Sequence, residues 1–108
     1  MFGFLNKLIE KLTGPPQFGA RSPNWAKVRD KFIDSHPFCE CCGGYEDLEV
    51  HHIIPFHIDR SLELEESNLI TLCRPHHLLL GHLMSWKSFN RAVRQDADTW
   101  RNKIRVRP

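Results

Sequence analysis

The stretch from residue 39 to residue 77 decides the fold, and it reads CECCGGYEDLEVHHIIPFHIDRSLELEESNLITLCRPHH. It opens with a C-x-x-C pair, Cys39 and Cys42, and closes with a C-x-x-H pair, Cys73 and His76. Each pair fits a tight turn, and together they supply the Cys3His set that encloses a structural zinc ion. Free buried thiols are the alternative interpretation. The spacing therefore predicts a zinc site that staples a small domain.

Cys41 lies between the two cysteines of the first pair and is the spare one. It could replace Cys39 or Cys42 as a ligand. We leave it out because Cys42 is followed by Gly43, which supplies the usual tight turn. Three cysteines within four residues are also poorly spaced for independent disulfides, so the cluster favours metal ligation in a reducing compartment.

Between the two pairs, the pattern predicts two strands joined by a long connection. The first runs over 48–50 into His51 and His52, and Pro55 ends its pairing. A polar and acidic loop follows, and the second strand covers 67–72. Adjacent side chains on a strand point to opposite sides, so one of these histidines can bind a metal ion while the other faces a substrate.

A helix expected near 75–85 adds more histidines to this hairpin, and Asn68 lies at the start of the second strand. The candidate site residues are His51, His52, Asn68, His77 and His82. Surface or core histidines are the plainer interpretation. Five such residues on two strands and one helix favour a functional site instead.

The segment from Cys39 to His77 resembles the HNH endonucleases, whose active site is a ββα-metal fold. The resemblance implies that His51 and His77 bind a catalytic divalent ion and that His52 is the general base. It implies that Asn68 holds the base-bearing segment by hydrogen bonding. The ion could be Mg²⁺, Mn²⁺, Ni²⁺ or Zn²⁺, since imidazole ligands favour later transition metals while availability favours magnesium.

Two positions depart from the family's pattern. His76 stands where many members have a cysteine, and this change keeps a zinc ligand. Many members also carry a histidine four residues after the last one, where this chain has Gly81. His82 comes one residue late, so its place as a third ligand is an open question.

Helices are expected on both sides of this unit. One begins at Ser22, as N-cap, with Pro23 in its first turn, and it ends at His36. The other covers about 86–103 and has four apolar positions: Trp86, Phe89, Val93 and Trp100. Residues 2–12 form a short amphipathic helix in this interpretation, which divides the chain into a helix and linker (1–20) and an HNH endonuclease domain (21–108). The N-terminal helix could contact a protein partner or a second copy.

The chain has 108 residues and a net charge of +2, with an acidic middle between basic ends. Residues 36–72 carry one basic and eight acidic side chains, whereas residues 83–108 carry seven basic and two acidic ones. The basic end therefore supplies the expected phosphate contacts: Arg101, Lys103, Arg105 and Arg107. No apolar run reaches the ~20 residues of a spanning helix, and the start lacks a signal peptide's apolar core. A cytoplasmic protein is expected.

These observations predict a small α+β domain with a ββα-metal centre, a structural zinc and flanking helices. The expected function is metal-dependent hydrolysis of DNA phosphodiester bonds with weak sequence specificity. A zinc-stabilised module that binds nucleic acid without cleaving it is the first alternative, and a metal-storage or metal-sensing domain is the second.

Overall fold

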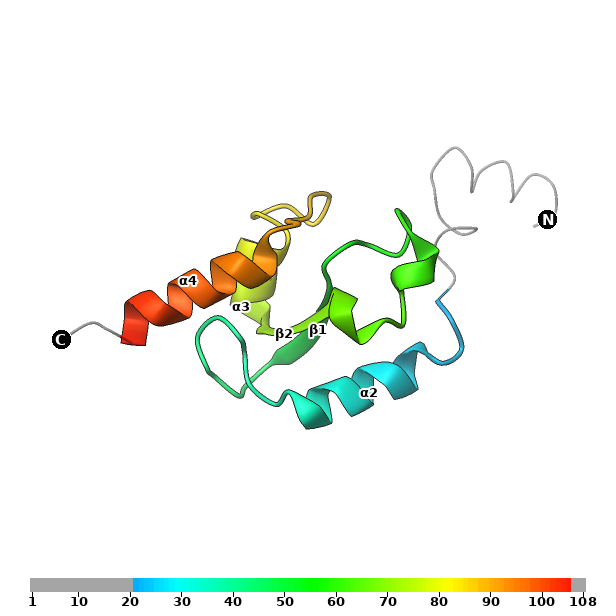
Figure 1. The fold of residues 1–108 in the computed structure, drawn as a ribbon, viewed down its shortest axis with the longest axis horizontal. Helices are drawn as coiled ribbons and strands as arrows, with labels where there is room; N and C mark the ends of the chain where they lie inside the picture. Colours follow the sequence, from blue (N-terminus) through cyan, green and yellow to red (C-terminus); the bar gives the residue numbers. More distant parts are fainter. Residues whose placement is uncertain (1–20, 106–108) are drawn as a thin grey trace.

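The computed structural model describes residues 21–105 (Figure 1). Its main elements are the helix α2 (Trp25–Ser35), the strands β1 (Leu48–His52) and β2 (Leu69–Cys73), the short helix α3 (Arg74–His76), a π turn (His77–Gly81) and the helix α4 (Val93–Arg105). The architecture is thus the expected small α+β unit. The helix predicted over 2–12, its linker to residue 20, and Arg107 lie outside the described residues. No described helix has the length and apolar character that crossing a membrane requires.

The two strands form an antiparallel hairpin in which Leu48 faces Cys73 and His52 faces Leu69. Every residue of β2 is buried, which explains its unbroken apolar and β-branched sequence. The second strand begins at Leu69 and not at residue 67, because Glu66–Asn68 form a 3₁₀ turn. The hairpin holds the C-x-x-C loop, the paired histidines and α3 in one small volume.

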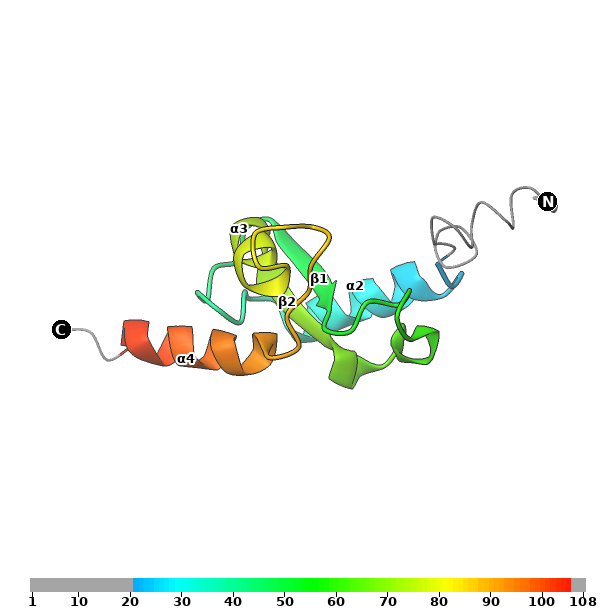
Figure 2. The ribbon, with the colours of Figure 1, turned by 90° about the horizontal axis from the view of Figure 1, so that it is seen from above.

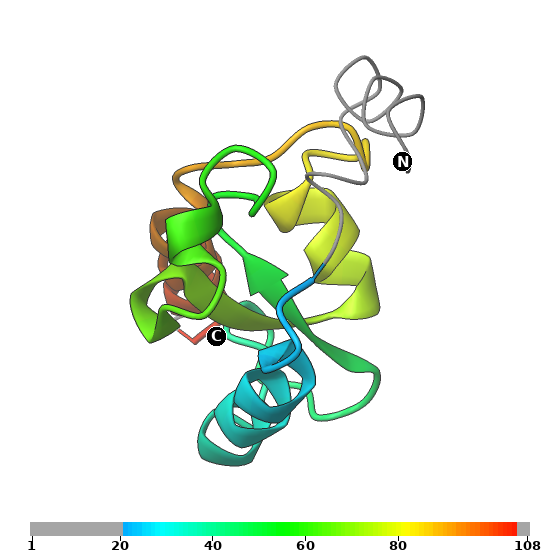
Figure 3. The same ribbon diagram turned by 90° about the vertical axis from the view of Figure 1, so that its right-hand side faces the viewer.

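Helix α2 packs along one side of the hairpin, and α3 lies on the opposite side (Figures 1 and 3). The predicted N-cap at Ser22 was wrong by two residues: the helix begins at Trp25 and Asn24 occupies the cap position. Ser22 still supports the entry, because its side-chain oxygen accepts a hydrogen bond from the Asn24 N–H at 3.1 Å. The helix ends before His36, as predicted, with the His36 N–H bonded to the Phe32 carbonyl.

The helix predicted over 86–103 begins only at Val93. Leu83 and Met84 both adopt left-handed backbone angles, with φ of 53° and 72°, and turn the chain into a loop. Trp86 is therefore an exposed loop residue and not an apolar point of a helix. Asn90 closes the loop, since its side chain accepts from the Ala92 N–H and donates to the Leu80 carbonyl.

The core lies where the first part of α4 packs against the hairpin and the loop that carries Cys39 and Cys41 (Figure 2). Val93 and Ala97, one helical turn apart, are the α4 residues that enter it. They join Cys39, Cys41, Ile70, Leu72 and Cys73. Trp100, which was expected to be another apolar point of this helix, is 41% exposed. Because so small a core contributes little stability, a bound structural metal ion would stabilise the fold substantially.

Candidate metal centres and active site

The predicted zinc ligands come together at one end of the hairpin. The ligand atoms of Cys39, Cys42, Cys73 and His76 all lie within 4.8 Å of one another. The Cys42 and Cys73 sulfurs are 4.0 Å apart, and Nδ1 of His76 is 3.8 Å from the Cys39 sulfur and 3.2 Å from that of Cys73. Zinc–sulfur bonds of ~2.3 Å in a tetrahedron imply edges of ~3.8 Å. The four donors therefore fit a structural metal ion.

The cysteine loop is shaped to present sulfur. Gly43 has a φ of 78°, and its N–H bonds to the Cys39 carbonyl at 2.8 Å. Gly43 thus provides the left-handed turn for which the sequence singled it out. Burial raises the pKa of Cys39, but hydrogen bonds from the backbone of Cys73, Cys42 and Cys41 outweigh it, and the pKa is lowered overall. A lowered pKa favours the thiolate, the form that binds metal.

Cys41 has a different environment from its neighbours. Its side chain is fully buried in the apolar core and is not part of the Cys3His cluster. Burial raises the pKa of its thiol to about 12, so it stays protonated. Cys41 therefore contributes to the packing of the apolar core, whereas the other three cysteines form the cluster with His76.

A second cluster brings together three histidines from two elements. His51 lies on β1, His77 is the first residue of the π turn, and His82 follows that turn. The ligand nitrogens of the three histidines lie within 4.8 Å of one another. Nε2 of His77 is 3.2 Å from Nε2 of His82. Nε2 of His51 is buried and has no hydrogen-bond partner among the described residues. An orphaned buried nitrogen that faces two other imidazoles fits a metal site.

Gly81 makes room for this cluster. A Cβ atom at residue 81 would lie 3.1 Å from Cε1 and 3.2 Å from both nitrogens of the His51 ring. Burial, followed by the neighbouring histidines, lowers the pKa of His51 to about 3. His51 is therefore neutral near pH 7, as a metal ligand has to be.

His52 is held in one tautomer by the backbone. Its Nε2 lies 2.9 Å from the Glu63 carbonyl, which can only accept a hydrogen bond, so Nε2 carries the proton. Nδ1 keeps its lone pair and lies 3.4 Å from Nη1 of Arg21. Burial lowers the pKa of His52 below its ordinary value, and the Trp25 ring covers it at 4.3 Å between centroids. The ring is thus a neutral base with a fixed orientation.

Asn68 holds the segment that follows His52. Its side-chain oxygen accepts from the Ile54 N–H at 2.9 Å, and its amide donates to the carbonyls of Ile54 and Leu62 at 3.0 and 3.2 Å. The buried side chain thereby joins the end of the first strand to the connecting loop. These contacts fit the positioning role predicted for Asn68, and its side chain is not part of the histidine cluster.

One pocket contains both the base and the histidine cluster. Its walls include the end of β1 with the segment that follows it, the histidines at the two ends of the π turn and the loop before α4, and no lining residue is acidic. The lining residues are Arg21, Val50, His51, His52, Pro55, Phe56, His57, His77, His82, Trp86, Lys87, Ser88 and Phe89. The strand alternation suggested opposite sides for His51 and His52, yet both line this pocket because it lies at the strand's end.

The family model for HNH endonuclease matches residues 39–83. Over these residues the chain is thus similar to HNH endonuclease domains. The match contains both ligand clusters, His52 and Asn68. Searches of curated proteins and of solved structures found no significant match.

The π turn explains how His82 comes to lie beside His77 although it is one residue late. The His82 N–H bonds to the carbonyl of His77, five residues earlier. In an α-helix, residues five apart would point about 140° away from each other. The wider turn absorbs the extra residue, and Nε2 of His82 lies 3.2 Å from Nε2 of His77.

Three supporting residues of the HNH site were not predicted from the sequence. Nδ1 of His77 contacts the Glu49 carboxylate at 2.7 Å, and Glu49 also accepts from Arg74 at 3.1 Å. Nδ1 of His82 lies 2.7 Å from the Ser88 carbonyl. Such contacts fix which nitrogen a metal-binding histidine offers. The only sequence signal was the position of Glu49 two residues before His51, on the same face of the strand.

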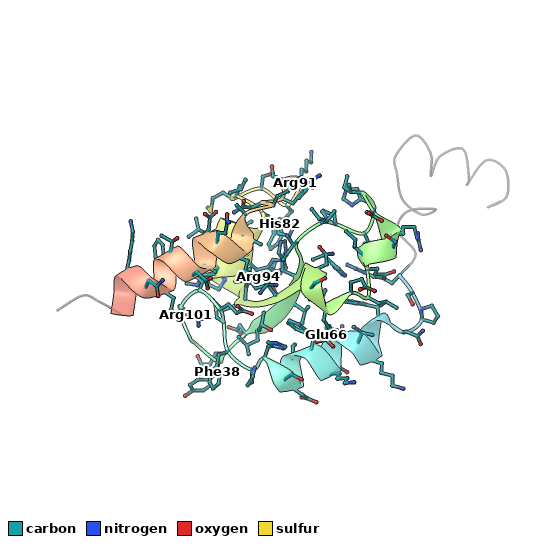
Figure 4. All side chains as sticks on the ribbon, in the orientation of Figure 1. Phe38, Glu66, His82, Arg91, Arg94 and Arg101 are labelled. Carbon is teal, nitrogen blue, oxygen red and sulfur yellow. The ribbon has the colours of Figure 1, made fainter. Side chains whose placement is uncertain are left out.

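Arg101, one of the four predicted phosphate contacts, is engaged away from the pocket. Helix α4 carries Arg101 away from His82 (Figure 4), and the Arg101 guanidinium donates to the Glu40 carbonyl. Lys103 is exposed. The side chains of Arg105 and Arg107 are outside the described part of the chain. Arg101 thus ties α4 to the cysteine loop, and the basic residues nearest the HNH site belong to other segments.

Proposed function

We propose that this chain is a metal-dependent endonuclease that hydrolyses DNA phosphodiester bonds, with residues 21–108 as its catalytic domain. The observation that carries this proposal is the shared pocket, which is lined by both His52 and the three-histidine cluster. HNH domains act on DNA, which gives the substrate class. A pocket without carboxylates also suits an anionic substrate better than the acidic middle of the sequence suggested.

In this proposal His52 is the general base. Nδ1 accepts a proton from the attacking water while the Glu63 carbonyl holds Nε2–H and stabilises the imidazolium that forms. The lowered pKa keeps the imidazole neutral near pH 7, ready to accept that proton. Asn68 maintains the geometry by fixing the segment that follows.

His51, His77 and His82 would hold one divalent ion: Mg²⁺, Mn²⁺, Ni²⁺ or Zn²⁺. When bound, such an ion polarises the phosphoryl oxygen and stabilises the leaving 3′-oxygen. Three neutral imidazoles favour the later transition metals in affinity. The separate Cys3His cluster would hold zinc for folding alone.

A non-catalytic nucleic-acid-binding module is the alternative, and the contacts of His52 favour the enzyme. A module that only binds has no use for a buried imidazole in the pocket lining that has one nitrogen bonded to a carbonyl and the other in only a long contact with Arg21. The phosphate contacts predicted for Lys103, Arg105 and Arg107 are compatible with either function.

Nicking of supercoiled plasmid by the full chain, with each of the four metal ions added separately, tests the proposal. We expect nicking with at least one ion. A protein that binds DNA but never nicks it with any of them would contradict the enzyme and favour the binding module.

A further inference from the structure

The proposed function leaves open which residue contacts the phosphate that is cleaved. None of the acidic side chains near the hairpin lines the pocket, and three of them have hydrogen-bond partners of their own. Glu49 is bonded to His77 and Arg74. Glu63 accepts from the Ser22 N–H at 3.0 Å, and its negative charge also attracts Arg21. Asp59 accepts from Ser61. The charges left at the pocket wall are those of Arg21 and Lys87.

Arg21 is the cation placed beside the base. Its Nη1 lies 3.4 Å from Nδ1 of His52, a long contact to a neutral acceptor. Its Cζ lies 4.4 Å from the centroid of the Phe56 ring and 5.2 Å from that of Trp25. A guanidinium that lies on aromatic faces keeps its N–H edge available for an anion.

A phosphate in the pocket would offer Arg21 a better partner than His52 does. Hydrogen bonds between a guanidinium and an anionic oxygen are about twice as strong as those between neutral partners, and they can be bidentate. Moving to the phosphate would also withdraw Nη1 from the lone pair that has to accept a proton from water.

We infer that Arg21 binds the DNA phosphate that is cleaved, and that this contact releases Nδ1 of His52 for proton transfer. The inference rests on the proposed function, because it assigns the substrate contact of that same site. It predicts two effects of Arg21: one on DNA binding through charge, and one on the rate at saturating DNA through positioning.

The test compares Arg21→Gln with Arg29→Gln in the full-length chain. Arg29 is a matched control, since it is an α2 arginine that pairs with Asp30 and is not part of the pocket lining. Zinc content and thermal unfolding establish that both variants are folded. Binding to a duplex is measured by fluorescence anisotropy from about 50 to 200 mM salt, with no divalent ion added.

We expect Arg21→Gln to lower the slope of log K against log salt by about 0.9, the value for one phosphate contact. The maximal nicking rate should fall by about 10²-fold, as when one charge-stabilising donor is lost, and Arg21→Lys should recover part of it. Arg29→Gln should change neither quantity.

The outcomes separate this inference from the proposed function. If the wild-type chain nicks DNA but Arg21→Gln leaves the salt slope and the maximal rate unchanged, the inference is overturned and the nuclease stands. If Arg21→Gln lowers the slope while the wild-type chain never nicks, the phosphate contact stands and the nuclease fails. A wild-type chain that does not bind DNA overturns both.

Discussion

At the scale of single residues, His52, His77 and His82 share one arrangement of ring contacts. A neighbour engages one ring nitrogen of each: the Glu63 carbonyl, the Glu49 carboxylate and the Ser88 carbonyl. The other nitrogen is left for chemistry in the pocket. The partners, and not the histidines themselves, decide which nitrogen is offered.

Glu49 is the charged partner among these, and its loss should weaken the catalytic metal site. We expect Glu49→Gln to reduce affinity for Mn²⁺ or Ni²⁺ by about tenfold, because a neutral amide orients His77 less firmly. Isothermal titration of zinc-loaded protein measures this. Arg74→Gln is the matched control, since it removes the other partner of Glu49 and keeps the contact to His77. Equal affinities in the wild type and Glu49→Gln would refute the orienting role.

Gly81 should be needed for the His51 ligand. A methyl group added there lies 3.1 Å from the His51 ring, so Gly81→Ala should push the imidazole out of the cluster. We expect weaker binding of the divalent ion with zinc content unchanged, again by titration. Leu79→Ala, an exposed change in the same turn, provides the comparison. Full affinity in Gly81→Ala would show that His51 can shift and still bind.

At the scale of elements, the π turn is the feature that could not be predicted from the spacing of residues in the sequence. Counting from His77 with α-helical periodicity puts residue 81 on the ligand face and leaves His82 beside it. The structure shifts one hydrogen bond to the fifth residue and reverses that conclusion. Local sequence does not encode such a shift visibly, because it depends on tertiary contacts such as the bonds from Asn90 to Gly81 and Leu80.

Removing one residue from the turn tests whether it compensates for the late histidine. Deleting exposed Leu79 leaves the two histidines four apart, which an ordinary α-helix places on one face. We expect the deletion to keep divalent-ion affinity within about tenfold of the wild type. Inserting an alanine at the same point should abolish binding. Equal losses in both variants, measured by titration, would contradict the compensation.

Other elements were predictable to different degrees. The hairpin was predicted because β2 is a buried run of apolar and β-branched residues, and Pro55 limits β1. The start of α4 was not predicted correctly, because Trp86 and Phe89 have the same helical spacing as the apolar residues of the helix itself. The positive φ angles at Leu83 and Met84 break the helix there, and neither residue type signals that conformation.

At the scale of the whole molecule, the Cys3His cluster joins the cysteine loop to the junction of β2 and α3. The sequence predicted these four residues as a group from their spacing, and the structure brings their ligand atoms together. The distribution of charge was less informative. The acidic middle segment suggested that DNA contacts lie in the C-terminal segment, yet none of its carboxylates lines the pocket, and those of Glu49 and Glu63 bond to neighbouring groups.

Loss of a cysteine ligand should unfold the domain. Structural zinc in small peptides contributes ~10–16 kcal/mol, which is comparable to the stability of a whole domain. We expect Cys39→Ser and Cys73→Ser to lose zinc together with their circular dichroism signal. Cys41→Ala should keep the zinc and cost about 1 kcal/mol, since it removes one buried sulfur from the core. Zinc loss in Cys41→Ala equal to that in Cys39→Ser would mean that Cys41 is a ligand.

The central claim is that one pocket joins a base that needs no metal contact to a histidine cluster that binds the ion. The most direct test is the plasmid nicking rate of His52→Ala over a range of Mn²⁺ concentrations, with His77→Ala run in parallel. The account predicts that His52→Ala is slower by about 10²–10⁴-fold at every concentration, while added ion partly restores His77→Ala. Recovery of His52→Ala at high Mn²⁺ would contradict it, because His52 would then act through the ion.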